Sequence, residues 1–184
     1  MPGDFKYAFN ANGQLDTTFL GSYQPKAYVG LSGGVNYKAL DFSFDIYSNI
    51  GNQVYNGKQQ ARVSSKDNIE ESIATSYWTT QNHSNTQPAA NGGNLPASSY
   101  FLASGTFVRI NNITLGYTLP EKVLSKQNII TSLRIFANAQ NPITLKTYGG
   151  FSSELPGSKT TNAGIELGTY PTTRTFAFGV NLGL

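Results

Sequence analysis

The stretch YPTTRTFAFGVNLGL, residues 170–184, alternates between two kinds of side chain. From Thr175 onward the odd positions are small or polar, while the even positions are apolar: Phe176, Phe178, Val180, Leu182 and Leu184. Strict alternation of this kind predicts a β-strand with one apolar face. No polar residues follow the strand in the sequence, although chain ends usually lie at the surface in contact with water. The apolar face therefore needs an explanation.

The composition favours strands and offers little charge to a water-exposed surface. Charged residues make up 12% of the 184 residues, about half of the ~25% typical of soluble domains. The 11 Tyr, 11 Phe and 19 Gly favour strands and tight turns. The absence of Cys excludes disulfides and thiolate metal sites. The formal net charge of +3 comes with no basic run, so nucleic-acid binding has no particular support.

Two membrane or export signals are missing from the sequence. No stretch approaches 18 apolar residues, so no transmembrane helix is expected. The start, MPGDFKYAF, lacks the basic and apolar regions of a signal peptide. If the protein works outside the cytoplasm, we expect further sequence before this chain.

Four more segments alternate in the same way: residues 27–37, 40–50, 106–119 and 132–140. The first two are separated so briefly that they predict a hairpin with a very short turn near Lys38. The third segment changes phase near Asn111–Asn112, which predicts a β-bulge there. The sequence therefore predicts an all-β fold, an antiparallel meander of five strands.

The connections between these segments alternate in length. A short turn is followed by a long polar segment, residues 51–104, then by a compact connection, PEKVLSKQNIIT, and then by a second long loop, residues 143–172. Transmembrane β-barrels have short periplasmic turns, longer outer loops and strands of about 10 residues that are apolar on the outside. In this interpretation the terminal strand faces lipid and ends at the periplasmic rim.

Five stretches resemble the C-terminal end of SusC/RagA-type TonB-linked outer-membrane transporters. They are PGDFKYAFNANGQLD, FLGSYQPKAYVGL, YFLASGTFVRINNITLGYTLP, LRIFANAQNPITLKTYGGFSSEL and YPTTRTFAFGVNL, which together run in order along nearly the whole chain. The most specific parts of the resemblance are the stretch at residues 105–120, NPITL at residues 141–145, and the Y-P-x-x-R motif that begins at Tyr170. The last residue departs from the pattern, because outer-membrane barrels usually end on an aromatic residue and this chain ends on Leu184.

The resemblance implies a transmembrane β-barrel of about 22 strands with a plugged lumen, in the cell outer membrane. Residues 1–26 would form an extracellular loop, and residues 27–184 would supply the last strands of the barrel, with long outer loops at about 51–104 and 143–172. The function implied is uptake of nutrient oligomers. The implied partners are lipid, a SusD-like surface lipoprotein, TonB through a separate N-terminal part, and a glycan or peptide ligand.

A degenerate calcium-loop motif lies near the start of the chain. Members of the family often carry D-x-N-x-D-G-x-I-D before these strands, and here the sequence reads AFNANGQLD. Asn10, Asn12 and Asp16 are the candidate metal ligands, although Ala8 and Asn12 replace two carboxylates that a calcium site depends on. An Asn-Gly turn is the interpretation we favour, so we predict neither a bound metal nor another cofactor.

The rest of the sequence contains few residues that could take part in catalysis or ligand binding. His83 is the only histidine and lies in the loop sequence QNHSNTQP, where we expect a solvated side chain. Tyr77 and Trp78 are the candidate ligand contacts, because flat aromatic rings stack on sugars. A local anchor that pins the long loop is the alternative that we favour. No catalytic residue is predicted, and the chain is not expected to be an enzyme.

A soluble β-sandwich that binds carbohydrate remains the alternative to the barrel. In a sandwich the apolar face of the strands would pack against a second sheet. The low charge content, the alternating connections and the apolar terminal strand favour the barrel.

Overall fold

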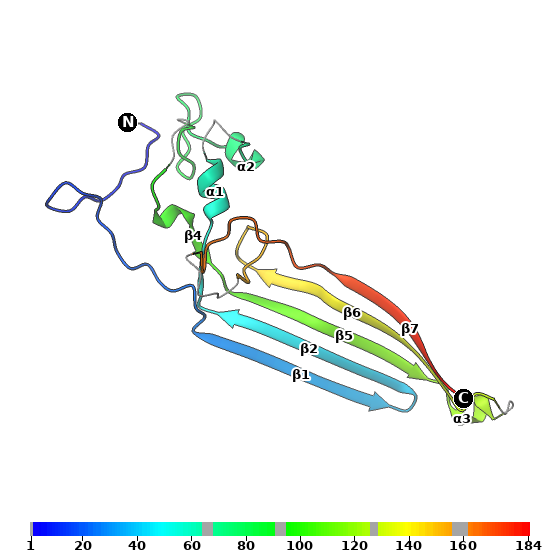
Figure 1. Cartoon of the computed structure of the whole chain (residues 1–184). Coiled ribbons are helices and arrows are strands. Elements are labelled where there is room, and N and C mark those ends of the chain that lie inside the picture. Colours follow the sequence, from blue (N-terminus) through cyan, green and yellow to red (C-terminus); the bar gives the residue numbers. More distant parts are fainter. Residues whose placement is uncertain (1, 64–67, 91–94, 126–128, 156–161) are drawn as a thin grey trace. The chain divides into compact units, whose positions relative to one another are not determined.

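The computed structural model describes residues 2–63, 68–90, 95–125, 129–155 and 162–184. The chain divides into two compact units, which we describe separately: one of Met1–Tyr23, Gln53–Ala103 and Leu155–Thr169, the other of Gln24–Asn52, Ser104–Glu154 and Tyr170–Leu184. Figure 1 labels most of the elements. In chain order they are β1 (Ala27–Tyr37), β2 (Leu40–Ile50), β3 (Gln53–Tyr55), α1 (Gly57–Arg62), α2 (Glu71–Ala74), η1 (Ser99–Phe101), β4 (Leu102–Ser104), β5 (Phe107–Thr118), α3 (Glu121–Leu124), β6 (Ser132–Lys146) and β7 (Thr175–Gly183).

The second unit is a five-stranded antiparallel sheet in the order β1-β2-β5-β6-β7 (Figure 1). Each strand pairs with the next long strand in the chain, so the predicted meander is confirmed. The turn between β1 and β2 consists of Lys38 and Ala39, and Lys38 adopts a left-handed conformation with φ of 55°. The predicted short turn is therefore also confirmed.

An extra residue in β5 lies where the sequence changes phase. Asp45 pairs with Asn112 and Ile46 pairs with Ile110, so that Asn111 bulges out of the β2–β5 ladder. The Asn111 amide Nδ2 donates to Asp45 Oδ1 at 2.9 Å. The predicted bulge is confirmed, and it keeps apolar residues on one face in both halves of β5.

The fourth strand is longer than the sequence indicated. The predicted strand stopped at Gln140, and it is followed by Asn141–Pro142, a pair that is locally unfavourable within a strand. In the structure β6 continues to Lys146, and its last residues pair with the first half of β5. Asn141 adopts a left-handed conformation, with φ of 49°, at the irregularity that accommodates the break.

Cross-strand pairing sorts the side chains of the sheet onto two faces, since directly paired residues point to the same side. One row across all five strands reads Val35, Phe42, Leu115, Ala137 and Phe178. We call the side to which this row belongs the apolar face. Its other large members are Val29, Leu31, Tyr37, Leu40, Phe44, Ile46, Ile50, Val108, Ile110, Ile113, Tyr117, Leu133, Ile135, Ile143, Leu145, Phe176, Val180 and Leu182.

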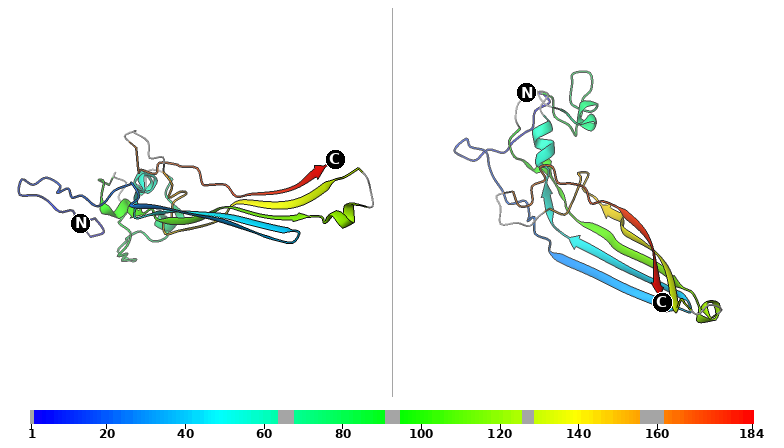
Figure 2. Two further views of the ribbon diagram at one scale, coloured as in Figure 1. Left: turned by 90° about the horizontal axis from the view of Figure 1, so that it is seen from below. Right: turned by 45° about the vertical axis from the view of Figure 1, so that its right-hand side comes forward.

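The apolar face is uncovered in the described part of the chain. Phe178 is 84% exposed, and Val35 and Leu145 are 59% and 67% exposed. Figure 2 shows the five strands as a single layer. A sandwich would need a second sheet over this face. The five-stranded sheet therefore leaves an apolar surface that the described residues do not bury.

The opposite side, which we call the polar face, is linked by side-chain hydrogen bonds. Asn138 Nδ2 donates to Asn112 Oδ1 at 2.7 Å and to Thr114 Oγ1 at 2.8 Å. Nearer the β1–β2 turn, Arg134 on β6 pairs with Asp41 on β2, with Nε–Oδ1 and Nη2–Oδ2 distances of 2.9 and 2.5 Å. This pair passes over Gly116 of β5, where a Cβ atom would collide with both side chains.

The first unit contains the short elements of the long polar segment, and it has a small core. Val63, Ile73 and Phe101 are almost fully buried there, with Tyr55, Ile69, Leu95 and Tyr100 packed around them. Asn56 caps α1, because its Oδ1 accepts from the Gln59 amide at 2.9 Å. The predicted loops also include residues 64–67, 91–94 and 156–161, which lie outside the described residues. Within the described part, no helix has the length and hydropathy needed to cross a membrane.

Candidate functional site

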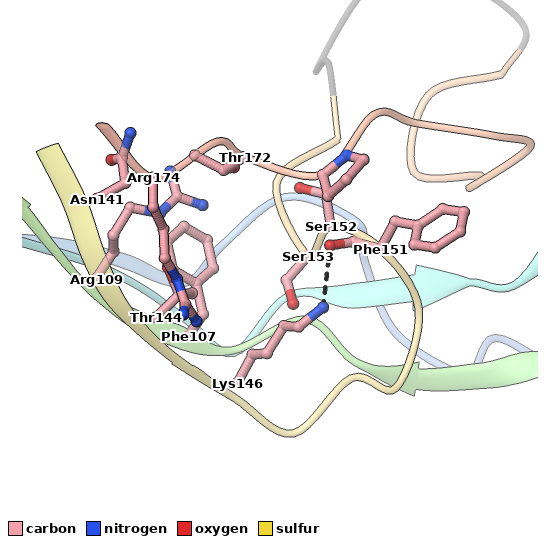
Figure 3. A pocket seen from close by; sticks show the side chains of 11 residues that line it. Phe107, Arg109, Asn141, Thr144, Lys146, Phe151, Ser152, Ser153, Thr172 and Arg174 are labelled. Carbon is pink, nitrogen blue, oxygen red and sulfur yellow. Dashed lines mark hydrogen bonds between the residues drawn. The ribbon is translucent and has the colours of Figure 1, made fainter. Parts of the chain in front are cut away.

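A cavity of about 180 Å³ lies on the polar face, at the end of the sheet where β5 begins and β6 ends. Figure 3 shows side chains from the strands and from two loop segments around it. The lining residues are Phe107, Arg109, Asn141, Thr144, Lys146, Phe151, Ser152, Ser153, Pro171, Thr172 and Arg174. We call this the polar-face cavity. All of its lining residues belong to the unit that contains the five-stranded sheet.

Arg109 of β5 is held in the cavity by three contacts. Its Nη1 lies 2.6 Å from Glu154 Oε2, and its Nε donates to Thr144 Oγ1 at 3.2 Å. The guanidinium carbon lies 4.9 Å from the ring centre of Phe107, within cation–π distance. The arginine side chain is only 9% exposed, so the ion pair holds the Glu154 loop against the strand.

The loop over the cavity is also held by its own hydrogen bonds. The Lys146 ammonium donates to the carbonyl of Gly150, and to that of Phe151 at 3.0 Å (Figure 3). Ser152 Oγ bonds both the amide and the carbonyl of Glu154, at 3.1 Å each. Lys146 and Ser152 therefore fix the backbone that positions the neighbouring Ser153 side chain.

The charges around the cavity are mostly positive. Arg109, Lys146 and Arg174 contribute three cations, and Glu154 contributes one carboxylate next to the lining residues. Ser153 is 4% exposed, and its Oγ is buried without a hydrogen-bond partner in the described structure. A buried, unsatisfied hydroxyl costs free energy unless a water or ligand fills the site. The arrangement is suited to an anionic group rather than to a cation.

A second cavity, of about 470 Å³, lies in the other unit and has an aromatic lining. Its walls include Phe5, Tyr7, Tyr55 and Tyr100, and the rings of Phe5 and Tyr100 are 4.7 Å apart. Burial raises the pKa of all three tyrosines above the ordinary value. Hydrogen bonds with Gln59 and Gln87 oppose the rise in the pKa of Tyr100. These phenols are therefore neutral at physiological pH.

The candidate calcium ligands lie in a small hairpin turn. Asn10 Oδ1 accepts from the amides of Asn12 and Gln14 at 3.0 Å each, and Gly13 adopts φ of 74°. The amide of Asp16 donates to the carbonyl of Ala8 at 2.8 Å. The side-chain oxygen of Asn10 is thus engaged in closing the turn. The described residues contain no group of three or more His, Cys, Asp or Glu that could hold a metal ion.

The predicted loop aromatics and the histidine lie in one segment. The rings of Trp78 and His83 are stacked, with centres 5.7 Å apart and an interplanar angle of 4°. The amide of Trp78 donates to Pro88 O at 3.1 Å, and Asn82 Nδ2 donates to Tyr77 O at 3.3 Å. The structure therefore brings Trp78 and His83 together, and neither is among the lining residues of the two cavities.

The sequence analysis missed the residues of the polar-face cavity. Arg109, Glu154 and Arg174 lie 20 to 65 positions apart, so no local spacing joins them. A signal was nevertheless present. Each is a charged residue inside one of the stretches that carry the family resemblance, GTFVRINN, FSSEL and YPTTRT, in a chain with little charge.

Curated proteins similar to this chain are TonB-dependent receptors. TonB-dependent receptor P3 of Formosa agariphila is 26% identical over 98% of this chain and 19% of its own length. TonB-dependent receptor SusC of Bacteroides thetaiotaomicron is 29% identical over 94% of this chain and 17% of its own length. No family model matches the sequence. The chain thus spans about a fifth of the length of these relatives.

Solved structures of the RagAB peptide importer share the fold. The closed-closed state gives a TM-score of 0.75 at 22% identity, over 95% of this chain and 20% of that chain. The open-open state gives 0.77 at 23% identity, over 96% of this chain and 19% of that chain. The fold is therefore that of a segment of the importer, an antiparallel sheet that is not closed. The resemblance inferred from the motifs is confirmed: over almost its whole length, this chain is similar to TonB-dependent receptors such as SusC.

Proposed function

We propose that the chain forms part of the barrel wall of a TonB-dependent transporter in the outer membrane, which imports nutrient oligomers. The observation that supports this most strongly is the apolar face, which runs unbroken across five paired strands and is not buried by any described residue. A protein surface of this size and character needs lipid or another apolar partner.

The polar face then lines the lumen of the barrel. Its hydrogen-bonded Asn138 cluster and its Asp41–Arg134 pair need the hydrated surroundings that a barrel interior provides. Residues 1–26, the long segment at about 51–104, and the part of the predicted loop 143–172 that follows the end of β6 form outer loops in this proposal. The first unit, with its own small core and aromatic cavity, belongs to those loops.

A SusD-like lipoprotein is the surface partner in this proposal, TonB acts through a separate part of the protein, and the ligand is a glycan or a peptide. The support is the similarity to SusC, and the fold shared with the RagAB peptide importer. No enzymatic step is part of the proposal. The role of the chain is to supply wall, loops and ligand contacts.

The test is to isolate the complete receptor that contains this chain. We expect it in the outer-membrane fraction, with heat-modifiable migration in gels, and we expect ligand uptake to stop when TonB is deleted. Recovery of the receptor in the cytoplasm, or uptake that is independent of TonB, would contradict the proposal.

The chain by itself gives a second test. Five strands leave two sheet edges with unpaired backbone groups, and such edges cause aggregation. Expressed without detergent, the chain should aggregate. A monodisperse soluble monomer with a cooperative thermal transition would favour the β-sandwich instead.

A further inference from the structure

We propose that the polar-face cavity binds a carboxylate group carried by the imported ligand. This inference rests on the proposed function, because only in an open transporter lumen does a ligand reach this side of the sheet. It deepens that function by naming the chemical group that the receptor recognises at this place.

The first argument is the balance of charge. Three cationic side chains, those of Arg109, Lys146 and Arg174, line the cavity, and Arg109 forms an ion pair with the adjacent Glu154. The lining residues thus present three cationic groups beside the single carboxylate of Glu154. An anion that enters gains charge-assisted hydrogen bonds, which are about twice as strong as neutral ones.

The second argument is the supply of unused donors. Arg174 makes no hydrogen bond to a described residue, and the Nη2 of Arg109 has no partner in the described structure, although its Nε and Nη1 are occupied. The hydroxyl of Ser153 is buried, and no described residue hydrogen-bonds to it. In Figure 3 Arg109 and Arg174 lie on one side of the cavity and Ser153 on another. Donors from separate segments thus surround one small space.

The third argument is size and shape. The cavity of about 180 Å³ exceeds the ~30 Å³ share of one water molecule several times. It is large enough for a carboxylate and the carbon atoms next to it. Guanidinium groups present paired N–H donors that match the two carboxylate oxygens. The rings of Phe107 and Phe151 offer apolar surface to the adjoining carbon atoms.

Two sources supply such a group: the C-terminus of a peptide and the acid of a uronic sugar. The experiment uses the complete receptor, purified in detergent, and four probes. These are an N-acetylated tripeptide with a free C-terminus, its C-terminal amide, a uronic-acid disaccharide and its methyl ester. Binding is measured by calorimetry. The amide and the ester are neutral controls of almost the same shape.

We expect the receptor to bind one of the two acids at least about tenfold more tightly than its neutral control, since a hydrogen bond to a charged group contributes that much. The acid that is preferred identifies the source. Arg174→Gln and Ser153→Ala should each reduce the preference to about threefold or less. Lys122→Gln should leave it unchanged, because that lysine lies in α3, in the connection at the opposite end of the strands.

Heat-modifiable migration in gels shows whether each variant has assembled as a barrel, so that a loss of binding can be distinguished from a failure to fold. A correctly assembled receptor that shows no preference for either acid, or whose preference survives both cavity variants, would overturn this inference and leave the proposed transport function intact. A receptor that never assembles as a barrel would overturn the proposed function, and this inference with it.

Discussion

Replacing Phe178 by arginine tests which face of the sheet meets lipid. Phe178 lies within β7, and its side chain is 84% exposed on the apolar face. Its direct partner across the ladder is Ala137, and the same row continues through Leu115 and Phe42 to Val35. In the proposed barrel, an arginine at this place would have no polar neighbour on its own row.

The expected cost follows from the depth of the residue. Phe178 is two residues from Phe176 and four from Leu182, the ends of the apolar stretch of β7. At about 3.4 Å per residue it lies well inside this stretch rather than at its edge. A cation on the lipid face costs about 2–4 kcal/mol near the bilayer midplane and about 0–1 kcal/mol near the interface. We therefore expect Phe178→Arg to cost about 2–4 kcal/mol of barrel stability.

Ala177→Arg is the matched control, because it places the same charge one residue away on the other face. Ala177 pairs with Asn138 on the polar face, so the arginine would meet polar side chains and water. Its cost should be about 1 kcal/mol or less. Both variants are compared in the complete receptor by the fraction of heat-modifiable barrel and by urea unfolding in lipid. Equal losses, or a larger loss for Ala177→Arg, would show that the faces are assigned the wrong way round.

Three further predictions concern single side chains in the complete receptor. Arg109→Gln removes a hydrogen-bonded ion pair and should lower the free energy of unfolding by about 1–3 kcal/mol in a urea titration; an unchanged midpoint would mean that the pair contributes nothing. Gly116→Ala should lower the urea midpoint, because the added methyl group would separate Arg134 from Asp41. Adding Arg134→Gln to this variant should lower the midpoint little further, since the ion pair is already broken. If the two substitutions lower stability additively, Gly116 does not act through this ion pair. His83→Ala should leave uptake within about twofold, a barrier change below ~0.5 kcal/mol, whereas a loss of orders of magnitude would identify the loop as a functional site.

Much of the sheet could be predicted because its signals are local. Alternation identified all five long strands, the brief gap at Lys38 identified a hairpin turn, and the change of phase identified the bulge at Asn111. The end of β6 was the exception. Asn141–Pro142 is a strong local breaker, yet pairing with β5 carries the strand on to Lys146. Hydrogen bonds to a neighbouring strand outweighed the local preference there.

The candidate sites were less predictable. The sequence indicated Asn10 and Trp78 as candidates, because a turn motif and a pair of neighbouring aromatic residues can be recognised in the sequence alone. Their roles in binding remain predictions. The polar-face cavity depends instead on Arg109, Ser153 and Arg174, which come from separate segments. Nothing in their spacing shows that they share one small space.

The sequence by itself determined the strands, their two faces and the resemblance to TonB-linked transporters, because alternation and family motifs are properties of short stretches. Tertiary structure alone decided the pairing register, which aligns the apolar residues of five strands into one continuous surface. It also decided that the Glu154 loop folds back onto Arg109 and that the Ser153 hydroxyl is buried with no hydrogen-bond partner among the described residues. These outcomes depend on contacts between residues far apart in the chain, and the free energy of such contacts is set only when the backbone brings the residues together.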